Sequence, residues 1–422
     1  MNKRTLYLRC QNEQKVNIKE RESMRKAKSL TGLALAAAVG AVSIAPTSAL
    51  AVPAFARVNN LPCSTCHTAF PKLTAFGENF MRNGFQLQEG GAEPARRDLS
   101  FASALDFLAF RGRMKLYESK NNQTLGTTEP NATVTSIGTN ENTYLYVAGS
   151  AWKNISVWME NSLVANDGTS NYALGFHNLG GSSLANIRFG RFTNTEWLSV
   201  SNQKRFLDPA YIAYAVATST TATGKDRVTS GGATDSVELY GYTGPVFYGL
   251  GYTPGASTSA NSKGNHWGTV RYDISSGAVA GSNISAQYYS GTDTNNTTTA
   301  LGKNKFSFTN LGGNLRLENL ELYGFYVKGK EDNYKYTGAK RDHTGHTVEA
   351  NYKLSPEFSA AVRYEVVNSD DDATLKKGLL TPGIVYSPYE NLRIMAYYAM
   401  DLDKDGNGQK NNVFLTNLQF AF

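Results

Sequence analysis

Two cysteines and a histidine within five residues carry the clearest chemical signal in the sequence. Cys63, Cys66 and His67 form a C-x-x-C-H run, which is the attachment signature of a c-type haem. Two thiols three positions apart can each form a thioether to one porphyrin vinyl group, and the next residue then supplies an imidazole to the iron. The run predicts one covalent haem c, bound through Cys63 and Cys66, with His67 as the proximal iron ligand.

Two other kinds of site use cysteines at this spacing. A zinc site needs further ligands nearby, and none follow at usable spacing. A redox-active pair of the thioredoxin type belongs to a βαβ context, which this sequence lacks. Haem attachment is therefore the favoured interpretation of residues 63–67.

The sixth ligand of the iron is left open by the sequence. Met81 lies fourteen residues after His67, in a predicted short helix over residues 73–83, and no other Met or His is close on the C-terminal side. A thioether ligand would raise the reduction potential relative to a second imidazole. Packing is the more ordinary role of a methionine. An open position and a distant histidine are the alternatives.

The N-terminal 51 residues resemble a secretory leader. Basic residues at 25–28 precede an apolar run over 30–45, and the small residues of 49–51 suit a cleavage site. The run is short for a membrane-spanning helix, which needs about 20 residues. We expect residues 1–51 to be a signal peptide, with residues 1–23 an extension caused by a misassigned start. Cleavage after Ala56 and an uncleaved anchor are the alternatives.

Composition narrows the class of protein. The chain of 422 residues has a formal net charge of +7, but nine basic and three acidic residues in the first 51 supply +6 of it. The remainder is nearly neutral, which argues against a nucleic-acid partner. A mean hydropathy of −0.38 excludes a polytopic helical membrane protein. Only three cysteines exclude a disulfide scaffold.

Residues 99–422 repeat one pattern, in which segments of about ten residues alternate apolar with small or polar side chains. Such alternation gives each strand one apolar and one polar face. With aromatic residues near strand ends, it predicts an all-β fold, a transmembrane barrel of about 16–18 antiparallel strands in contact with outer-membrane lipid. The last strand ends on an aromatic, Phe422, as in barrel assembly signals. The clearest segments are 144–152, 155–165, 236–242, 246–252, 320–327, 346–354, 358–366, 392–398 and 413–422.

The strand count depends on one ambiguous region. About 17 candidates are visible, but a bacterial barrel of one chain should have an even number. Either residues 193–210 hide a strand, or the weak candidate 172–177 is not one. The charged residues of 193–210 could instead fold into the lumen as a constriction loop, with an ordinary surface loop as the alternative. These residues are Glu196, Lys204, Arg205 and Asp208.

The segment 52–98, which carries the haem motif, is too short to bury a haem in a core of its own. A barrel of this size has a lumen that could enclose it. We expect a haem-bearing plug inside the barrel. Long polar stretches alternate with short turns such as 354–357 and 387–391, which predicts that both termini are periplasmic.

The motif residues also resemble a known family, the fused monohaem cytochrome–porins. That family includes outer-membrane iron oxidases, which take electrons from extracellular Fe(II) and pass them to periplasmic c-type cytochromes. The resemblance covers about 35 residues and implies haem attachment by Cys63 and Cys66 and ligation by His67. Phe85 stands where an aromatic, often Tyr, is expected. The residues that carry the resemblance are Ala54-Phe55-Ala56-Arg57, Cys63-Ser64-Thr65-Cys66-His67, Phe70-Pro71-Lys72-Leu73, Phe76-Gly77 and Asn83-Gly84-Phe85.

Several predicted outer-loop residues could meet a cationic donor. Asp370–Asp372 and the aspartates at 401, 403 and 405 suit hard divalent cations, although ordinary solvated loops are the favoured explanation. His343 and His346 flank another predicted outer loop, residues 330–343, where they could hold a metal transiently, although an ordinary polar role is favoured. His177 and His266 are predicted to lie on strands, with their facing undetermined.

Three functions remain open at this point. The first is an outer-membrane conduit that takes electrons from Fe(II) or a similar donor to a periplasmic acceptor, an oxidoreductase of the Fe(II):cytochrome c type. The second is a diffusion porin with a structural or regulatory haem segment. The third is a conduit to an external acceptor. One-electron transfer needs no acid, base or nucleophile, which agrees with the lack of such a constellation in the sequence.

Overall fold

A computed structural model describes most of the chain after residue 53. All described residues belong to one compact unit, Ala51–Phe422. The predicted signal peptide, 1–51, lies outside the described residues and stays a prediction. The described ranges are 54–69, 72–87, 106–125, 129–164, 170–199, 201, 205–207, 233–254, 264–294, 303–334, 338–369, 377–403 and 410–422.

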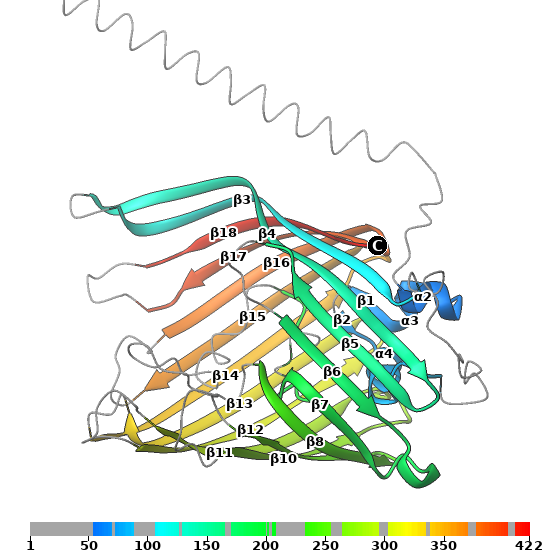
Figure 1. The fold of residues 1–422 in the computed structure, drawn as a ribbon. Helices are drawn as coiled ribbons and strands as arrows, with labels where there is room; N and C mark the ends of the chain where they lie inside the picture. Colours follow the sequence, from blue (N-terminus) through cyan, green and yellow to red (C-terminus); the bar gives the residue numbers. More distant parts are fainter. Residues whose placement is uncertain are drawn as a thin grey trace, which may run out of the picture. The chain divides into compact units, whose positions relative to one another are not determined.

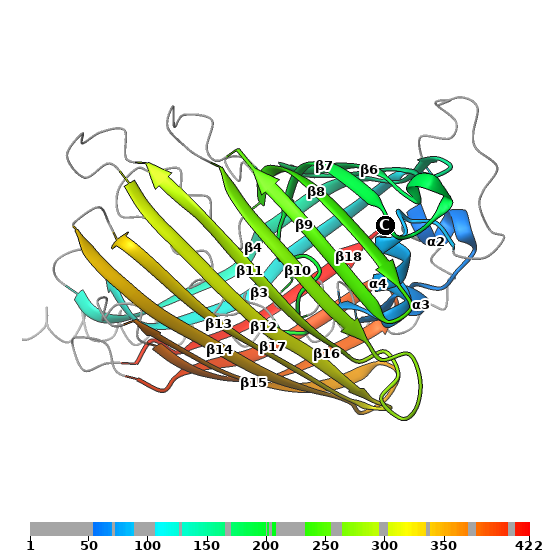
Figure 2. The ribbon, with the colours of Figure 1, turned by 90° about the horizontal axis from the view of Figure 1, so that it is seen from below.

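The described residues of this unit form a closed barrel of sixteen antiparallel strands (Figure 1, Figure 2). Each strand pairs with its neighbours in sequence, and β18 pairs with β3 to close the barrel, with Leu418 opposite Met114. The strands are β3 (Leu108–Leu125), β4 (Glu129–Trp152), β5 (Ile155–Ser162), β6 (Ser170–Phe176), β7 (Asn186–Thr193), β8 (Ala233–Thr243), β9 (Val246–Thr253), β10 (Asn265–Asp273), β11 (Asn283–Thr294), β12 (Lys303–Leu317), β13 (Leu320–Tyr334), β14 (Ala339–Lys353), β15 (Phe358–Ser369), β16 (Lys377–Tyr389), β17 (Leu392–Asp401) and β18 (Val413–Ala421).

The polarity of the barrel wall is opposite to that of a water-soluble protein. Along β14, Arg341 and Glu349 are buried in the lumen, whereas Val348 and Tyr352 are about half exposed on the outer surface. The same alternation leaves apolar side chains such as Ile284 on the outside of other strands. An apolar outer band with a polar interior is the pattern of a transmembrane barrel. In the described part of the chain, no helix has the length and apolar character needed to cross a bilayer.

The two ends of the barrel differ in the length of their connections. At one end, the connections after β4, β8, β12, β14 and β16 are two to four residues long, and those after β6 and β10 are nine residues long. At the other end, the connection between β7 and β8 runs from 194 to 232. Phe422 exchanges backbone hydrogen bonds with Phe110 at the end with short turns, where Figure 1 marks the C-terminus.

The structure resolves the ambiguous strand count at sixteen, by a different route from the one expected. Residues 172–177 were the weak candidate, yet β6 covers 170–176 and pairs with both β5 and β7. That part of the prediction is wrong. The described residues of 194–207 form turns and bends, and none of them belongs to a strand. Residues 330–343, predicted as an outer loop, are mostly the ends of β13 and β14.

A small unit of helices and short strands lies at the short-turn end of the barrel, and we call it the plug (residues 54–87; Figure 1). Its last helix begins at Thr74, whose hydroxyl accepts a hydrogen bond from the Gly77 amide at 3.1 Å, a side-chain cap. Glu78 in the first turn and Arg82 in the last turn both suit the helix dipole. The elements are α2 (Ala54–Asn59), α3 (Cys63–Cys66), β1 (His67–Ala69), β2 (Lys72–Leu73) and α4 (Ala75–Arg82).

Candidate cofactor site

Helix α3 brings the three residues of the C-x-x-C-H run to one cavity. Cys63 and Cys66 are its first and last residues, and His67 follows where the chain becomes extended. All three line a cavity of about 460 Å³ between the plug and the barrel wall. Helix α4 packs closely behind them, since a Cβ at Gly77 would lie 2.3 Å from the Cys66 carbonyl oxygen. A glycine at this position lets the two helices meet.

The two thiols are half-buried, and their surroundings favour the protonated form. Both are free rather than joined in a disulfide. Burial, and then the neighbouring Cys63, raise the pKa of Cys66 to about 11. Burial also raises the pKa of Cys63. Redox-active C-x-x-C pairs have lowered thiol pKa values instead, so this environment argues against the thioredoxin-like alternative.

The start of α3 is held by the turn between β16 and β17. The Glu390 carboxylate accepts a hydrogen bond from the Cys63 amide at 2.8 Å and another from the Ser64 hydroxyl at 2.9 Å. Glu390 therefore ties the first cysteine to the rim of the barrel.

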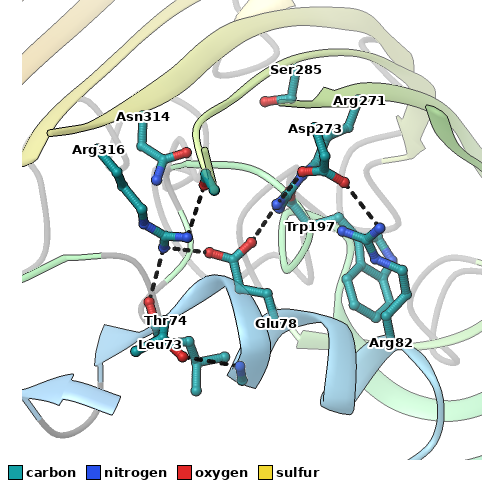
Figure 3. Close-up of polar contacts among 12 residues, drawn as sticks. Leu73, Thr74, Glu78, Arg82, Trp197, Arg271, Asp273, Ser285, Asn314 and Arg316 are labelled. Atoms are coloured by element: carbon teal, nitrogen blue, oxygen red, sulfur yellow. Dashed lines mark hydrogen bonds and ion pairs between the residues drawn. The ribbon is translucent and has the colours of Figure 1, made fainter. Parts of the chain in front are cut away.

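Helix α4 is held by a network of ion pairs with the barrel wall (Figure 3). Glu78 is buried and pairs with Arg271 on β10 and with Arg316 on β12, the latter at 2.9 Å. One turn further on, Arg82 pairs with Asp273 at 3.0 Å. These side chains converge from two strands and one helix, as Figure 3 shows, so charge complementarity specifies where α4 docks.

A fourth ion pair anchors the short strand β2. The Lys72 ammonium lies 2.5 Å from the Glu321 carboxylate on β13. It also lies over the rings of Tyr323 and Phe206, at 4.6 and 5.3 Å from their centroids. A buried lysine needs such partners, because an unpaired charge in this environment is costly.

The cavity wall combines flat apolar rings with cationic groups. Arg188 on β7 pairs with Glu238 at 2.7 Å, yet its Nη2 is buried without a hydrogen-bond partner. A haem presents a flat apolar ring and two carboxylates, so rings together with arginines fit this group in chemical character. The volume also lies within the usual range for ligand pockets, about 300–1,000 Å³. Aromatic lining residues include Phe80, Phe85, Phe110, Tyr144, Trp158 and Trp197, and the arginines are Arg111, Arg113, Arg188 and Arg205.

Met81, the methionine considered as a sixth ligand, lies on α4 and lines the cavity. It packs against a buried cluster that contains Trp197, Tyr240 and Phe247. The structure therefore gives Met81 a packing role and leaves its ligation untested.

His177 lines the same cavity, although sequence reasoning gave it no role in the site. It was expected on a strand but lies one residue beyond β6 and is buried. Its Nε2 is 2.7 Å from the Ser156 hydroxyl, and its Nδ1 is 3.0 Å from the Tyr240 hydroxyl. Burial, and then the nearby Arg188, lower the pKa of His177 to about 4, so the imidazole is neutral at neutral pH. No local pattern around residue 177 marks it as a site residue.

The segment after β7 folds into the lumen. The Trp197 indole donates to Glu238 on β8 at 2.9 Å, and the Phe206 amide donates to Glu349 on β14 at 2.9 Å. These strands lie six apart in the sixteen-strand ring, so the described residues of the segment reach across the lumen. This supports the constriction loop over the alternative of an ordinary surface loop. Glu196 and Arg205 line the cavity, whereas Lys204 and Asp208 lie outside the described residues.

The other candidate metal residues do not gather into a site. His343 is buried within β14, and His346 has the opposite parity on that strand, so their side chains face opposite sides of the wall. The prediction that they flank a loop is wrong. His266 lies outward on β10, beside Tyr252. Asp401 ends β17 and pairs with Lys377 at 3.1 Å, whereas Asp370–Asp372 and residue 405 lie outside the described residues. Among described residues, no group of three or more His, Cys, Asp or Glu could hold a metal ion.

Comparison with protein families gives one match, confined to the barrel. Residues 239–420 match the family described as "Putative beta-barrel porin-2, OmpL-like". This range starts in β8 and ends in β18, and therefore excludes the plug and its haem motif. No curated protein sequence matches the chain.

Solved structures with the same fold are porins of low sequence identity. An anion-selective porin from Comamonas acidovorans has a TM-score of 0.56 at 13% identity, over 75% of this chain and 99% of its own. Salmonella typhi OmpF, in a complex with daunomycin, has 0.52 at 10%, over 75% and 97%. The outer-membrane channel DcaP of Acinetobacter baumannii has 0.50 at 12%, over 77% and 99%. The fold, the apolar outer surface and the family match identify the chain as a porin-like β-barrel of the outer membrane.

Proposed function

We propose that this porin-like barrel carries one covalent haem c in its lumen and passes electrons across the outer membrane. The observation that carries the proposal is the shared cavity. Cys63, Cys66 and His67 all open onto one aromatic- and arginine-lined space enclosed by plug and barrel. A protein without a haem has no evident need for this arrangement at the end of a porin barrel.

The chain's own residues have distinct parts in this proposal. Cys63 and Cys66 form the thioethers, and His67 binds the iron on the proximal side. The haem, when bound, supplies a one-electron redox centre. The arginines of the cavity would balance the charge of its carboxylates, and the packed plug would limit contact with water.

The resemblance of the motif residues to monohaem cytochrome–porins supports Fe(II) as the electron donor. In that case one electron leaves an extracellular Fe(II), which becomes Fe(III), and the same electron reaches a periplasmic c-type cytochrome. The barrel wall keeps this route apart from the lipid. The orientation with both termini in the periplasm belongs to the same proposal.

A diffusion porin is the second candidate, and the comparisons favour it. The family match and the structural neighbours are porins. Four arginines line the cavity, which would suit passage of anions. The segment that crosses the lumen from Trp197 to Phe206 would then act as the constriction of the pore rather than as part of an insulating wall.

Two measurements on the purified protein separate these candidates. Anaerobic addition of Fe(II) should reduce the haem, which is followed by its α-band, and planar bilayers containing the haem-loaded protein should show little ion conductance. The His67→Ala variant should keep its thioether-linked haem but lose fast reduction. A purified protein without covalent haem, or one with haem that Fe(II) leaves oxidised while ions flow freely, would favour the diffusion porin.

A further inference from the structure

We infer that His177, a residue of the barrel wall, is the sixth ligand of the haem iron. This inference rests on the proposed function, since it requires the haem. The plug would then provide the proximal ligand, His67, and the barrel the distal one. The iron would link two parts of the chain that are 110 positions apart in the sequence.

His177 is in the right place for this role. It follows β6 directly and lines the cavity that Cys63, Cys66 and His67 also line. Its ring lies against the plug, because a Cβ at Gly84 would be 2.3 Å from its Nε2. Gly84 also has a φ of +67°, in the left-handed region that favours glycine. The imidazole thus occupies the interface where plug and barrel enclose the cavity.

The hydrogen bonds of His177 leave one ring nitrogen available to a metal. The Tyr240 hydroxyl donates its proton to the Arg82 carbonyl oxygen at 3.1 Å. Its oxygen must therefore accept from Nδ1–H of His177, at 3.0 Å. Nε2 then carries the lone pair, which accepts a hydrogen bond from the Ser156 hydroxyl at 2.7 Å. Rotation of the Ser156 side chain about χ1 would move Oγ away from Nε2 and open this nitrogen to iron.

This arrangement is the usual one for metal-binding histidines. A ligating imidazole almost always donates its other N–H to an oxygen acceptor, which fixes the tautomer and the direction of the ring. Here the acceptor is Tyr240, which Arg82 of α4 holds in turn. Docking of α4 therefore orients the proposed ligand.

Met81 is the competing ligand, and its surroundings favour packing. It contacts the cluster of Trp197, Tyr240 and Phe247, which accounts for its apolar side chain. The two ligands also predict different haems. Two imidazoles give a lower reduction potential than an imidazole with a thioether.

Spectroscopy of the haem-loaded full chain tests the assignment. The ferric wild-type protein should give the low-spin electron paramagnetic resonance and near-infrared spectrum of two imidazole ligands. His177→Gly should become high-spin, and added imidazole should restore the low-spin spectrum. If His177 had only a structural role, added imidazole would not restore the low-spin spectrum of His177→Gly. Met81→Leu is the matched control and should leave the spectrum unchanged.

Two outcomes would overturn the inference. One is a sulfur-to-iron charge-transfer band in the wild-type protein that disappears in Met81→Leu, and the other is an unchanged low-spin spectrum in His177→Gly. If His177→Gly fails to assemble, the wild-type spectrum alone still decides between imidazole and thioether. Haem staining of the denatured wild-type chain tests the proposed function separately from the ligand assignment. A wild-type chain without covalent haem would contradict the proposed function itself.

Discussion

At the scale of single residues, the plug is positioned by side chains that fit the barrel wall. Asn83 accepts a hydrogen bond from the Tyr242 hydroxyl at 3.0 Å, and Phe85 stacks on Phe55 with ring centroids 4.6 Å apart. These residues belong to the motif that resembles the cytochrome–porins. Their contacts indicate that part of the motif serves docking and folding of the plug rather than redox chemistry.

Gly84→Ala should disturb the plug far more than a comparable change elsewhere. An alanine there would meet the His177 ring at 2.3 Å and would also adopt a positive φ, which costs about 1–2 kcal/mol. Gly138→Ala is the control, since its φ is +66° but nothing lies within 4 Å. We expect faster proteolysis of the plug in Gly84→Ala only. Equal proteolysis in the two variants would show that the ring contact is unimportant.

Glu78→Gln should weaken the attachment of the plug without unfolding the barrel. The change removes the carboxylate shared by Arg271 and Arg316, and breaking a buried ion pair costs about 3–5 kcal/mol. Each arginine keeps a second carboxylate, Asp273 or Glu321, so we expect the lower end of this range. Limited proteolysis of the folded protein measures the effect.

The control for this variant is Glu357→Gln, in the exposed turn after β14, where the carboxylate only accepts a hydrogen bond from Ser355. It should behave as the wild type. Unchanged protection of the plug in Glu78→Gln would mean that apolar packing, rather than the ion pairs, holds α4.

At the scale of elements, the described residues of 194–207 reach across the lumen. The near end of this segment is bonded to β8 through Trp197, and its far end is bonded to β14, β15 and β17 through Phe206 and Leu207. Leu207 is fully buried in a cluster with Val385, Met395 and Leu415. Polar bonds and apolar burial act together, so the described residues of this segment are firmly attached to the wall.

Glu349→Ala should loosen the far end of this segment and open the lumen to ions. Glu349 accepts hydrogen bonds from the Phe206 and Leu207 amides and pairs with Arg363. Leaving these buried groups unsatisfied costs about 1–3 kcal/mol each. We expect a higher single-channel conductance in planar bilayers than for the wild type, with Glu357→Gln unchanged. A conductance equal to that of the wild type would show that the segment does not limit passage.

At the scale of the whole molecule, the short-turn end carries the plug, and the other end carries the longer connections. Outer-membrane barrels have short periplasmic turns and long outer loops. We therefore expect the plug to face the periplasm, where an electron acceptor would be found.

Surface labelling tests this orientation. Lys340→Cys, near the start of β14, should react with a membrane-impermeant maleimide on intact cells. Glu357→Cys, in a short turn, should react only after the outer membrane is permeabilised. Both side chains are exposed, so access alone would not explain a difference. The reverse pattern would place the plug at the cell surface.

Much of the architecture follows from local sequence patterns. Alternation with period two predicted most of the strands, because side chains of a strand point to opposite faces wherever that strand pairs. The short helix predicted over residues 73–83 corresponds to α4, residues 75–82, although its cap by Thr74 was not predicted. The exception was β6, whose seven residues include Gly175 and alternate weakly. Its pairing with β5 and β7 established this weak candidate as a strand.

For the predicted site as well, some features follow from local sequence and others only from the tertiary structure. The sequence by itself predicted a haem site at the C-x-x-C-H run, since the proposed thioether and proximal-ligand residues are neighbours along the chain. Only the tertiary structure decided that Glu78 faces Arg271 and Arg316, that the described residues of 194–207 reach across the lumen, and that His177 shares a cavity with His67. These contacts depend on strand register and barrel closure, which join residues far apart in sequence and leave no local pattern to read.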